Sequence, residues 1–475
     1  MRALFSFVKQ LTKEENRFVA WIAALAALGG FLFGFDTGVV GSAEPYFAPA
    51  LHTGSFGESW VVGSLLLGAV CGAASAGYLA DVISRKWTKM TGGIVFFIAA
   101  IGSAFPSDLQ WLCVARFVIG LGVGASSFVA PMYISEQSPK GLRGGMTALN
   151  QVMITFGILV AYLSDYALSG IGKDNWRWMF GVEAVPGAAL AVAMVFVPHT
   201  PRWLVEHDRE EEAERVLGRT RHSDDIGEEL NDIKDVSAAQ RKTGVRQVLF
   251  STRLRPFMII GVVLAFLQQA VGINAILYFG AVDLKFMGLS TATAVYEAIT
   301  LGIVNFVFAV VAVMILDWVG RKPLLVVGSA GMLLSLIGEG WFFSNATSYQ
   351  HANAIYGLAF VLAFLAFFEL SLGPVFWLMI SELYPLRARA KAMAVATMVN
   401  WTFNFLVSYF YLTMTKDLGR DGTFWFFGFF ALISVIFTAF KVPETKQRSL
   451  EQIEQEVRGD NQAIAWSRPG QSATA

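Results

Sequence analysis

Twelve runs of apolar residues alternate with short polar segments along the chain. Their approximate limits are 18–42, 58–80, 89–105, 109–134, 145–168, 177–199, 256–280, 291–316, 323–345, 355–381, 391–413 and 423–441. An α-helix needs about 20 apolar residues to cross a bilayer. The pattern therefore predicts an all-α membrane protein with twelve transmembrane helices. The first run is too long, and its polar flank too extended, for a cleaved signal peptide, so we interpret it as the first span.

A charged stretch from Glu206 to Arg255 separates six runs from six. It contains an amphipathic pattern at Ile226, Leu230 and Ile233, and this periodicity favours a few short helices over an extended solvated linker. We predict a cytoplasmic N-terminal segment 1–17, a six-helix bundle 18–199, a cytoplasmic linker 200–255, a second six-helix bundle 256–442 and a cytoplasmic tail 443–475.

The composition supports membrane insertion and excludes several other classes. The chain is 55% hydrophobic and 15% charged, whereas soluble domains carry roughly 25% charged residues. Its 36 basic and 36 acidic residues balance, so we expect no nucleic-acid binding. Cys71 and Cys113 both lie in apolar runs, which excludes a disulfide framework. No metal cluster or nucleophile motif indicates an enzyme, and we expect neither a metal nor a cofactor.

The basic residues predict the orientation in the membrane. Of the 36 Lys and Arg residues, all but six fall on the side of the N-terminus. The other side holds Lys173, Arg177, Lys285, Lys416 and Arg420, and Arg116 lies within a span. Because Lys and Arg are enriched in cytoplasmic loops, we expect both termini in the cytoplasm. The compact outer loops indicate a bacterial inner membrane.

Two loop motifs occur once in each half of the chain. In the first, Asp is followed at +4 and +5 by Arg and Lys; in the second, Glu is followed at +7 by Arg. The residues are Asp81, Arg85, Glu136 and Arg143, and then Asp317, Arg321, Glu382 and Arg389. Basic residues alone would be topology signals, but acidic partners at fixed spacing favour charge pairs that form a cytoplasmic gate. Parallel repeats of this kind occur in transporters with two six-helix halves.

The longer motifs carry a family resemblance. They are RFVIGLGVG around Arg116, PMYISE (131–136), GLRG (141–144), PHTPRWL (198–204), QQAVGINAILYF (268–279), DWVGRK (317–322), GPVFW (373–377) and PETKQRSLEQIE (443–454). In order and spacing they resemble the sugar porter family of the major facilitator superfamily, over about residues 18–457. That family includes bacterial proton-coupled carriers of xylose, arabinose, galactose and inositol, and animal glucose facilitators. The resemblance implies the major facilitator fold and sugar transport.

Two motifs depart from the family pattern. The loop DVISRK has Val82 and Ser84 where the family usually has a basic residue and Gly. The motif PHTPRWL has His199 and Thr200 in place of the Glu and Ser of PESPRWL. Both departures lie at helix ends and bear on gating rather than on transport itself.

Amide and aromatic side chains form the candidate sugar site. Amides both donate and accept hydrogen bonds without charge, and aromatic rings suit the apolar faces of sugars. A helix break near Gly272 and another at Gly373-Pro374 would let residues of spans 7 and 10 converge. For a lone amide, helix–helix hydrogen bonding is the simpler alternative. The set matches the sugar-contacting positions of the family: Gln151, Gln268, Gln269, Asn274, Asn305, Trp377, Asn400, Trp401 and Asn404.

Three charged residues within spans are the candidates for proton coupling. Asp36, Arg116 and Glu183 each lie about 10 Å below the outer surface by residue count. Charge inside a span is costly and therefore points to function. A nearby Arg favours an ionised carboxylate, so separating Asp36 from Arg116 would favour protonation. Family symporters resemble this chain in having Asp here, where passive facilitators have Asn; a structural ion pair is the alternative. Glu369 does not discriminate, since facilitators can carry Glu there.

These patterns predict a secondary transporter that imports a monosaccharide or a cyclic polyol such as inositol together with a proton. A passive facilitator is the alternative within transport. A non-transporting nutrient sensor is disfavoured because such proteins carry a long cytoplasmic tail. The amide-rich set fits hexoses, pentoses and inositols alike. We expect the protein to function as a monomer in the lipid bilayer.

Overall fold

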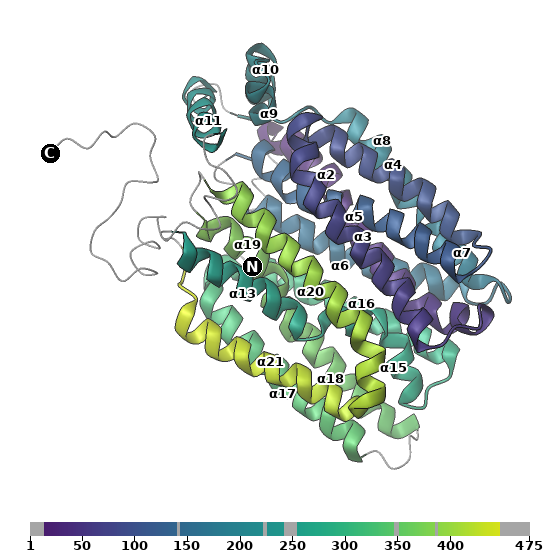
Figure 1. Cartoon of the computed structure of the whole chain (residues 1–475). Coiled ribbons are helices and arrows are strands. Elements are labelled where there is room, and N and C mark those ends of the chain that lie inside the picture. The colour runs from purple at the N-terminus through teal and green to yellow at the C-terminus, as the bar shows by residue number, and fades with distance from the viewer. Residues whose placement is uncertain are drawn as a thin grey trace.

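The computed structural model describes residues 14–139, 143–221, 226–241, 254–345, 351–384 and 388–446. Regular secondary structure within these ranges is helical. Figure 1 shows long helices side by side, with α9, α10 and α11 gathered at one end. We call the end that carries these three helices the linker face and the opposite end the far face.

Each half of the chain forms its own set of long helices. The first half contains α2 (Glu14–Ala50), α3 (Ser55–Val82), α4 (Arg85–Ala104), α5 (Leu109–Gln137), α6 (Arg143–Leu168), α7 (Asn175–Val182) and α8 (Ala184–Phe196). Between the halves lie α9 (Pro201–Glu206), α10 (Glu210–Thr220) and α11 (Ile226–Arg241). The second half contains α13 (Arg255–Ala270), α14 (Ile273–Tyr278), α15 (Gly280–Phe286), α16 (Thr291–Val319), α17 (Arg321–Asn345), α18 (His351–Glu369), α19 (Leu372–Leu383), α20 (Arg389–Asp417) and α21 (Gly419–Lys441).

The described helices agree with a twelve-span major facilitator fold. Eleven helical spans among them are long and apolar enough to cross a bilayer. The remaining predicted run, 391–413, lies in α20, a helix of 29 residues. Its Asn400 and Asn404 are buried, and α20 packs against α3, α13 and α21. These amides therefore face the protein interior.

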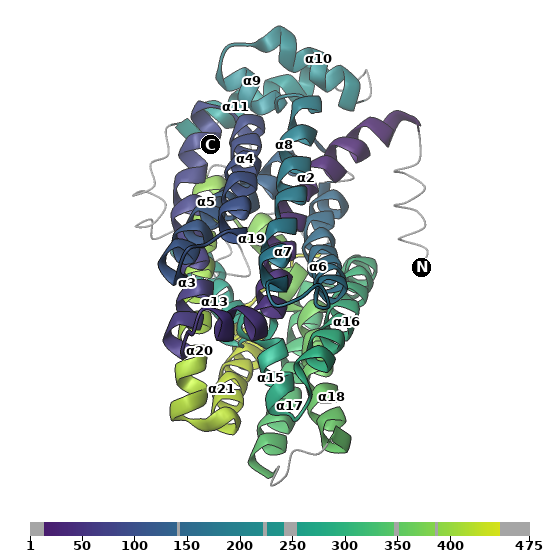
Figure 2. The same cartoon turned by 90° about the vertical axis from the view of Figure 1, so that its right-hand side faces the viewer.

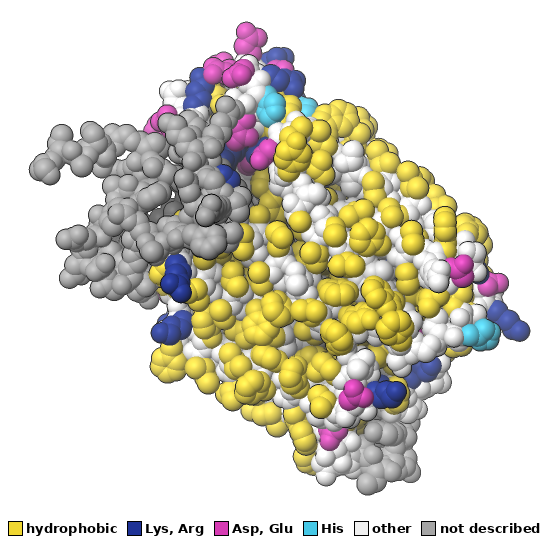
Figure 3. All heavy atoms as spheres, viewed as in Figure 1, with side chains coloured by type: hydrophobic (Ala, Val, Ile, Leu, Met, Phe, Trp, Pro, Cys, Tyr) yellow, Lys and Arg dark blue, Asp and Glu magenta, His cyan; other side chains and the backbone are white. Residues whose placement is uncertain are grey.

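Apolar side chains cover the lipid-facing surface. In Figure 3, hydrophobic side chains cover the middle of the visible face, and charged side chains gather at its two ends. Large exposed hydrophobic side chains on the long helices include Phe97, Ile98, Leu334 and Phe440. Such a belt is what hydrocarbon on the outside of the bundle requires.

Two predicted helix breaks are confirmed. α13 ends at Ala270 and α14 begins at Ile273, because Gly272 adopts φ +88°, a conformation that favours glycine. A β-carbon there would lie 2.4 Å from the ring of Phe427. The break between α18 and α19 falls just ahead of Gly373-Pro374. Pro374 thus sits in the first turn of α19, where its missing N–H is tolerated.

A third break was not predicted. Glu183 separates α7 from α8, and Pro186 lies in the first turn of α8, the same offset as Ser371 and Pro374 at the start of α19. In the sequence, the signal for this break is Pro186, three residues after Glu183. Its consequence is that a buried carboxylate stands at a helix interruption rather than on a continuous helix.

The two halves touch each other at the far face. The Tyr162 hydroxyl on α6 donates a hydrogen bond to the backbone oxygen of Leu277 on α14 at 3.2 Å. Trp60 on α3 packs edge-on against Tyr409 on α20, with ring centroids 5.1 Å apart. A β-carbon on Gly41 would lie 2.6 Å from the Leu277 oxygen. The far side of the central cavity is therefore closed by contacts between the halves.

Candidate functional site

A cavity lies between the two halves and is lined from both. It encloses about 1070 Å³, including the part open to solvent. All nine predicted sugar-site residues line it: Gln151, Gln268, Gln269, Asn274, Asn305, Trp377, Asn400, Trp401 and Asn404. It is also lined by Pro131, Thr147, Leu316 and Leu378, which lie toward the linker-face ends of their helices. The cavity therefore extends toward the linker face.

The amides of α13, α14 and α20 form one hydrogen-bonded group. Asn274 donates to the side-chain oxygen of Gln269 at 2.8 Å, and Gln269 donates to Asn400 at 3.2 Å. The Gln268 amide donates to the backbone oxygen of Leu372 at 3.0 Å, and Asn400 donates to Gln268. The break at Gly272 makes this possible, because Asn274 and Gln269 point in different directions on a straight helix.

Asn305 and Trp401 have unused hydrogen-bonding capacity at the cavity wall. Within the described part of the chain, neither side-chain polar atom of Asn305 has a hydrogen-bond partner, and the same holds for the Trp401 indole N–H. Both side chains are buried. Buried polar atoms are normally paired, so these groups are suited to a ligand that supplies hydroxyls.

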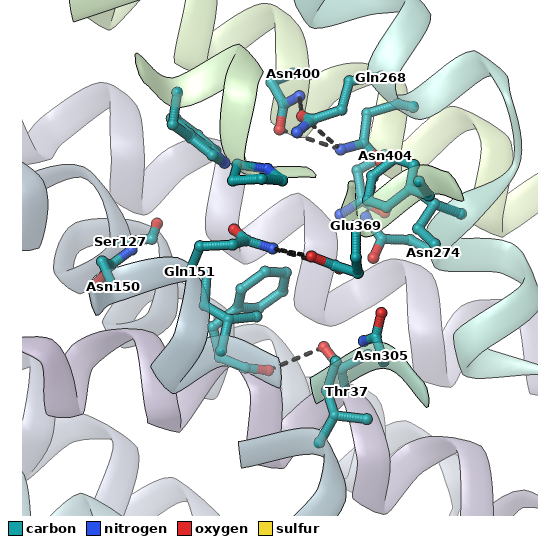
Figure 4. A pocket seen from close by; sticks show the side chains of 18 of the residues that line it. Thr37, Ser127, Asn150, Gln151, Gln268, Asn274, Asn305, Glu369, Asn400 and Asn404 are labelled. Atoms are coloured by element: carbon teal, nitrogen blue, oxygen red, sulfur yellow. Dashed lines mark hydrogen bonds between the residues drawn. The ribbon is translucent and has the colours of Figure 1, made fainter. Parts of the chain in front are cut away.

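Glu369 is a site residue that sequence reasoning set aside. It is buried and accepts a hydrogen bond from the Gln151 amide at 3.2 Å, which joins α18 of the second half to α6 of the first. Figure 4 shows the two side chains facing each other beside Asn305 and Asn274. Thr37 and Asn150 also line the cavity; their only sequence signal was proximity to Asp36 and Gln151.

The three proton-coupling candidates meet inside the first half. Arg116 on α5 binds Asp36 on α2 through two nitrogens, at 2.6 and 3.3 Å. One of these nitrogens also lies 3.4 Å from Glu183. All three side chains are at most 1% exposed. The group therefore holds one cation between two carboxylates, and Arg116 can shift its preference between them.

Tyr278 connects this charged group to the cavity. It stands at the end of α14 in the second half and is 1% exposed. It lies near Asp36 and Arg116 and near Thr37 and Asn404, and the last two line the cavity; within the described residues its hydroxyl has no hydrogen-bond partner.

Charged residues at the linker face tie helix ends within the first half. Arg85 lies 3.1 Å from Asp81, 3.3 Å from Glu136 and 3.5 Å from Glu206, which joins α3, α4, α5 and α9. The Arg143 side chain lies outside the described residues. The predicted network therefore includes α9 of the linker, which the sequence motif did not indicate.

The second half repeats this arrangement. Arg321 lies 3.0 Å from Asp317 and 2.9 Å from Glu382, and Glu382 also accepts a hydrogen bond from Thr445. Arg389 donates to the backbone oxygen of Tyr384 at 3.1 Å. In each half, the Glu of the second motif therefore pairs with the Arg of the first motif: Glu136 with Arg85, and Glu382 with Arg321. These pairs link the two motifs.

Comparison with known proteins agrees with this architecture. Residues 22–457 match the family model described as "Sugar (and other) transporter". The chain belongs to this sugar transporter family. It is 37% identical to the glucose transporter GlcP of Staphylococcus epidermidis, over 94% of this chain and 98% of that one. It is 35% identical to the arabinose-proton symporter of Escherichia coli, over 94% of both chains.

Solved structures show the same fold. The proton:xylose symporter XylE bound to 6-bromo-6-deoxy-D-glucose superposes with a TM-score of 0.82 at 31% identity, over 93% of this chain and 99% of that chain. The partially occluded inward-open form of XylE from E. coli gives a TM-score of 0.79 at 29% identity, over 91% of this chain and all of that chain. The protein is therefore a major facilitator transporter, not an enzyme.

Proposed function

We propose that this protein imports a monosaccharide together with a proton, by alternating exposure of one central cavity to the two sides of the membrane. The observation that carries this proposal is the adjacency of two groups, an amide-lined cavity between the halves and the buried Asp36–Arg116–Glu183 group. Its relatives include named sugar–proton symporters for arabinose and galactose, which supports the same pairing of substrates.

Uncharged side chains of the cavity recognise the sugar. Hydroxyls of the sugar can donate to and accept from Asn305, Gln269 and Asn274, which line the cavity. Trp377 and Trp401 offer apolar surface for the C–H groups of the ring. Such a site accepts pentoses, hexoses and cyclic polyols such as inositol alike. We therefore propose a monosaccharide or inositol-like substrate.

Asp36 is the residue that binds the coupled proton. Arg116 stabilises its ionised form, and burial favours its neutral form. Any movement that lengthens the Arg116–Asp36 contact therefore favours uptake of a proton. Glu183 offers Arg116 an alternative partner when that happens. Because Tyr278 lies near Asp36 and near the cavity-lining Thr37 and Asn404, sugar binding and proton binding can influence each other.

We also propose the membrane orientation and surroundings. The linker face is cytoplasmic, because the linker and loop segments on that side carry most of the Lys and Arg residues. Both termini are then cytoplasmic, in the inner membrane of a bacterium. The protein functions as a monomer, since each chain contains both halves of the cavity.

Uptake into proteoliposomes tests this function. Purified protein is reconstituted, a panel of radiolabelled pentoses, hexoses and inositols is supplied, and an inward proton gradient is imposed. We expect one or more sugars to accumulate above the external concentration, and an uncoupler to abolish the accumulation. Equilibration without accumulation, unaffected by the uncoupler, would identify a passive facilitator. Absence of uptake for every sugar would contradict the proposal.

A further inference from the structure

A second buried group of charged residues lies in the second half, apart from Asp36 and Arg116. Asp283 on α15 forms an ion pair with Arg420 at the start of α21 and accepts a hydrogen bond from the Tyr411 hydroxyl on α20 at 2.5 Å. Asp283 is 4% exposed. In Figure 2 these helix ends lie at the far face, opposite α9 and α10.

Glu339 on α17 stands beside this group without a partner of its own. It is 0% exposed, and neither of its carboxyl oxygens has a hydrogen-bond partner within the described residues. The charges of Asp283 and Arg420 act on it directly, and its own charge acts on Tyr411. Among the described residues these are the titratable or charged groups that face it.

Contacts with aromatic rings place Arg420 and the start of α21 against the same side of α17 as Glu339. The Arg420 guanidinium lies 6.0 Å from the ring of Phe343, which is one turn after Glu339 and on the same helix face. A β-carbon on Gly340, the residue after Glu339, would lie 2.3 Å from Trp425 on α21. Arg420 therefore lies on the side of α17 that carries Glu339, and it is paired with Asp283.

α15 is also the element that connects this group to the first half. It packs against α2, and its Lys285 acts electrostatically on Glu44 of that helix. Opening of the far side must separate α15 from α2. A displacement of α15 relative to α21 would carry Asp283 away from Arg420, which belongs to α21.

We propose that Glu339 is a second proton-binding carboxyl and that Arg420 exchanges its ion-pair partner as α15 moves. With the far side closed, Arg420 pairs with Asp283, and Glu339 is neutral because an isolated buried charge is costly. With the far side open, Asp283 enters water as a carboxylate and Arg420 pairs with Glu339. The Glu339 proton then leaves to the outer solution. Acid outside thus favours the closed far side.

The physiological role of this second site rests on the proposed symport, but opening of the far side can be measured without sugar. Cys71 and Cys113 are first replaced by Ser. Spin labels are then attached to cysteines introduced by Phe56→Cys on α3 and Lys416→Cys on α20. Both original side chains are exposed. Double electron–electron resonance across the far face then reports the open fraction as a function of pH. The Asp36→Asn variant serves as the background, because it removes the first proton carrier.

In that background we expect the open fraction to rise with pH. Glu339→Gln is expected to remove this dependence, since it cannot lose a proton. Glu297→Gln, a carboxyl elsewhere at the far face on α16, is expected to leave it intact. Asp283→Asn frees Arg420 for Glu339 and should move the midpoint toward acid by about one to two pH units.

An unchanged pH dependence in a folded Glu339→Gln variant would overturn the proposal, as would an Asp36→Asn background that shows none. So would an unshifted midpoint in Asp283→Asn, which tests the partner exchange with Glu339 still present. Sugar uptake by the wild-type protein is measured in parallel. If uptake is passive while the Glu339 effect is present, the proposed symport fails and this second proton site stands.

Discussion

Carboxyl side chains inside the bundles differ in what surrounds them, and this decides what each can do. Asp36 is held by two nitrogens of Arg116, whereas the hydrogen-bond donor to Glu369 within the described residues is the neutral amide of Gln151. Within the described residues, Asp165 has no hydrogen-bond partner at either carboxyl oxygen. A charge in a span is expensive, so the carboxyl with a cation beside it is the one that can be ionised in one state and neutral in another.

Asp36→Asn is expected to separate coupling from sugar translocation. The amide keeps the size and a hydrogen bond to Arg116 but removes the titratable proton. Uphill accumulation and alkalinisation of the outer medium on sugar addition should be lost, while sugar binding and exchange across liposomes persist. Sugar accumulation against a gradient by this variant would mean that coupling lies elsewhere, and Glu183→Gln would be tested next.

Gln269→Ala is expected to weaken sugar binding without affecting folding. Gln269 bridges Asn274 and Asn400, so its loss removes one donor and one acceptor and leaves two amides less well oriented. Affinity should fall about threefold to tenfold, corresponding to about 0.5–1.5 kcal/mol for one hydrogen bond, as measured by ligand-induced thermal stabilisation. Ile259→Ala, an exposed position on the same helix, is the control. Wild-type affinity in a folded Gln269→Ala protein would give this residue a structural role.

At the scale of elements, α4 in the first half and α17 in the second half are equivalent helices, but different residues stabilise their N-terminal ends. In the second half, Gly320 has φ +104°, and Glu444 accepts hydrogen bonds from the backbone N–H groups of Arg321 and Lys322, both at 3.1 Å. In the first half, Ser84 has φ +93° and its side chain accepts from the Trp87 N–H. His199 occupies the place of Glu444 and lies 3.0 Å from the Ser84 hydroxyl. The two departures from the family pattern are therefore in contact.

His199 is suited to this place only in its neutral form. Burial, followed by the charges of Lys86 and Arg209, lowers the pKa of His199 to about 4, so the ring is neutral at pH 7 and stacks on Trp203 with centroids 4.8 Å apart. Because this pKa is below the unfolded value of about 6.5, the folded state binds the proton less well. The corresponding stability is present above about pH 6.5 and is lost as the pH falls toward about 4.

The double variant Ser84→Gly, His199→Glu is expected to stabilise the first half. Glycine removes the strain of a positive φ, about 1 kcal/mol, and the introduced carboxylate can accept hydrogen bonds from the N-terminal turn of α4, as Glu444 does for α17. Thermal unfolding in detergent should show a higher midpoint for the double variant than for either single one. A double variant less stable than both singles would refute the equivalence of the two helix starts.

At the scale of the whole molecule, ion pairs bind each half into a unit at the linker face. Arg85 joins α3 and α4 to α5 and α9, and Arg321 joins α16 and α17 to α19. The linker is attached as well, because Arg221 donates to the backbone oxygens of Gln137 at 2.8 Å and Ser138 at 3.1 Å. Contacts between the halves, by contrast, include aromatic pairs at the far face.

Arg321→Gln is expected to loosen the linker face. Loss of the ion pairs to Asp317 and Glu382 should make a cysteine at the cavity position Leu378 more accessible to a reagent applied from that side. We expect a three- to tenfold faster reaction, which corresponds to a loss of about 1 kcal/mol in the free energy that favours the closed linker face. Arg177→Gln, which removes the Arg177–Asp174 ion pair outside this network, is the control. Equal reaction rates in both variants, with normal transport, would contradict a gating role. Arg143 and Arg389, the basic ends of the second motif, are the next positions to test.

The sequence by itself determined the features that depend on local pattern. Apolar runs define helices wherever a bilayer surrounds them, so the spans and the division into halves were predictable. Gly272 and Pro374 marked breaks because their backbone restrictions act within a few residues. The amides of the cavity could be listed because their chemistry suits sugars whatever their exact placement.

Only the tertiary structure decided which of these side chains meet. The Gln151–Glu369 hydrogen bond joins residues 218 positions apart, and the Asp283–Arg420 pair spans 137 positions. Such contacts depend on how each helix is rotated about its axis and which helix lies beside it. Packing of side chains from many helices sets that rotation, and no local stretch of sequence contains it. For the same reason the sequence shows Glu339 only as one acid in an apolar span, and its role follows from the helices packed around it.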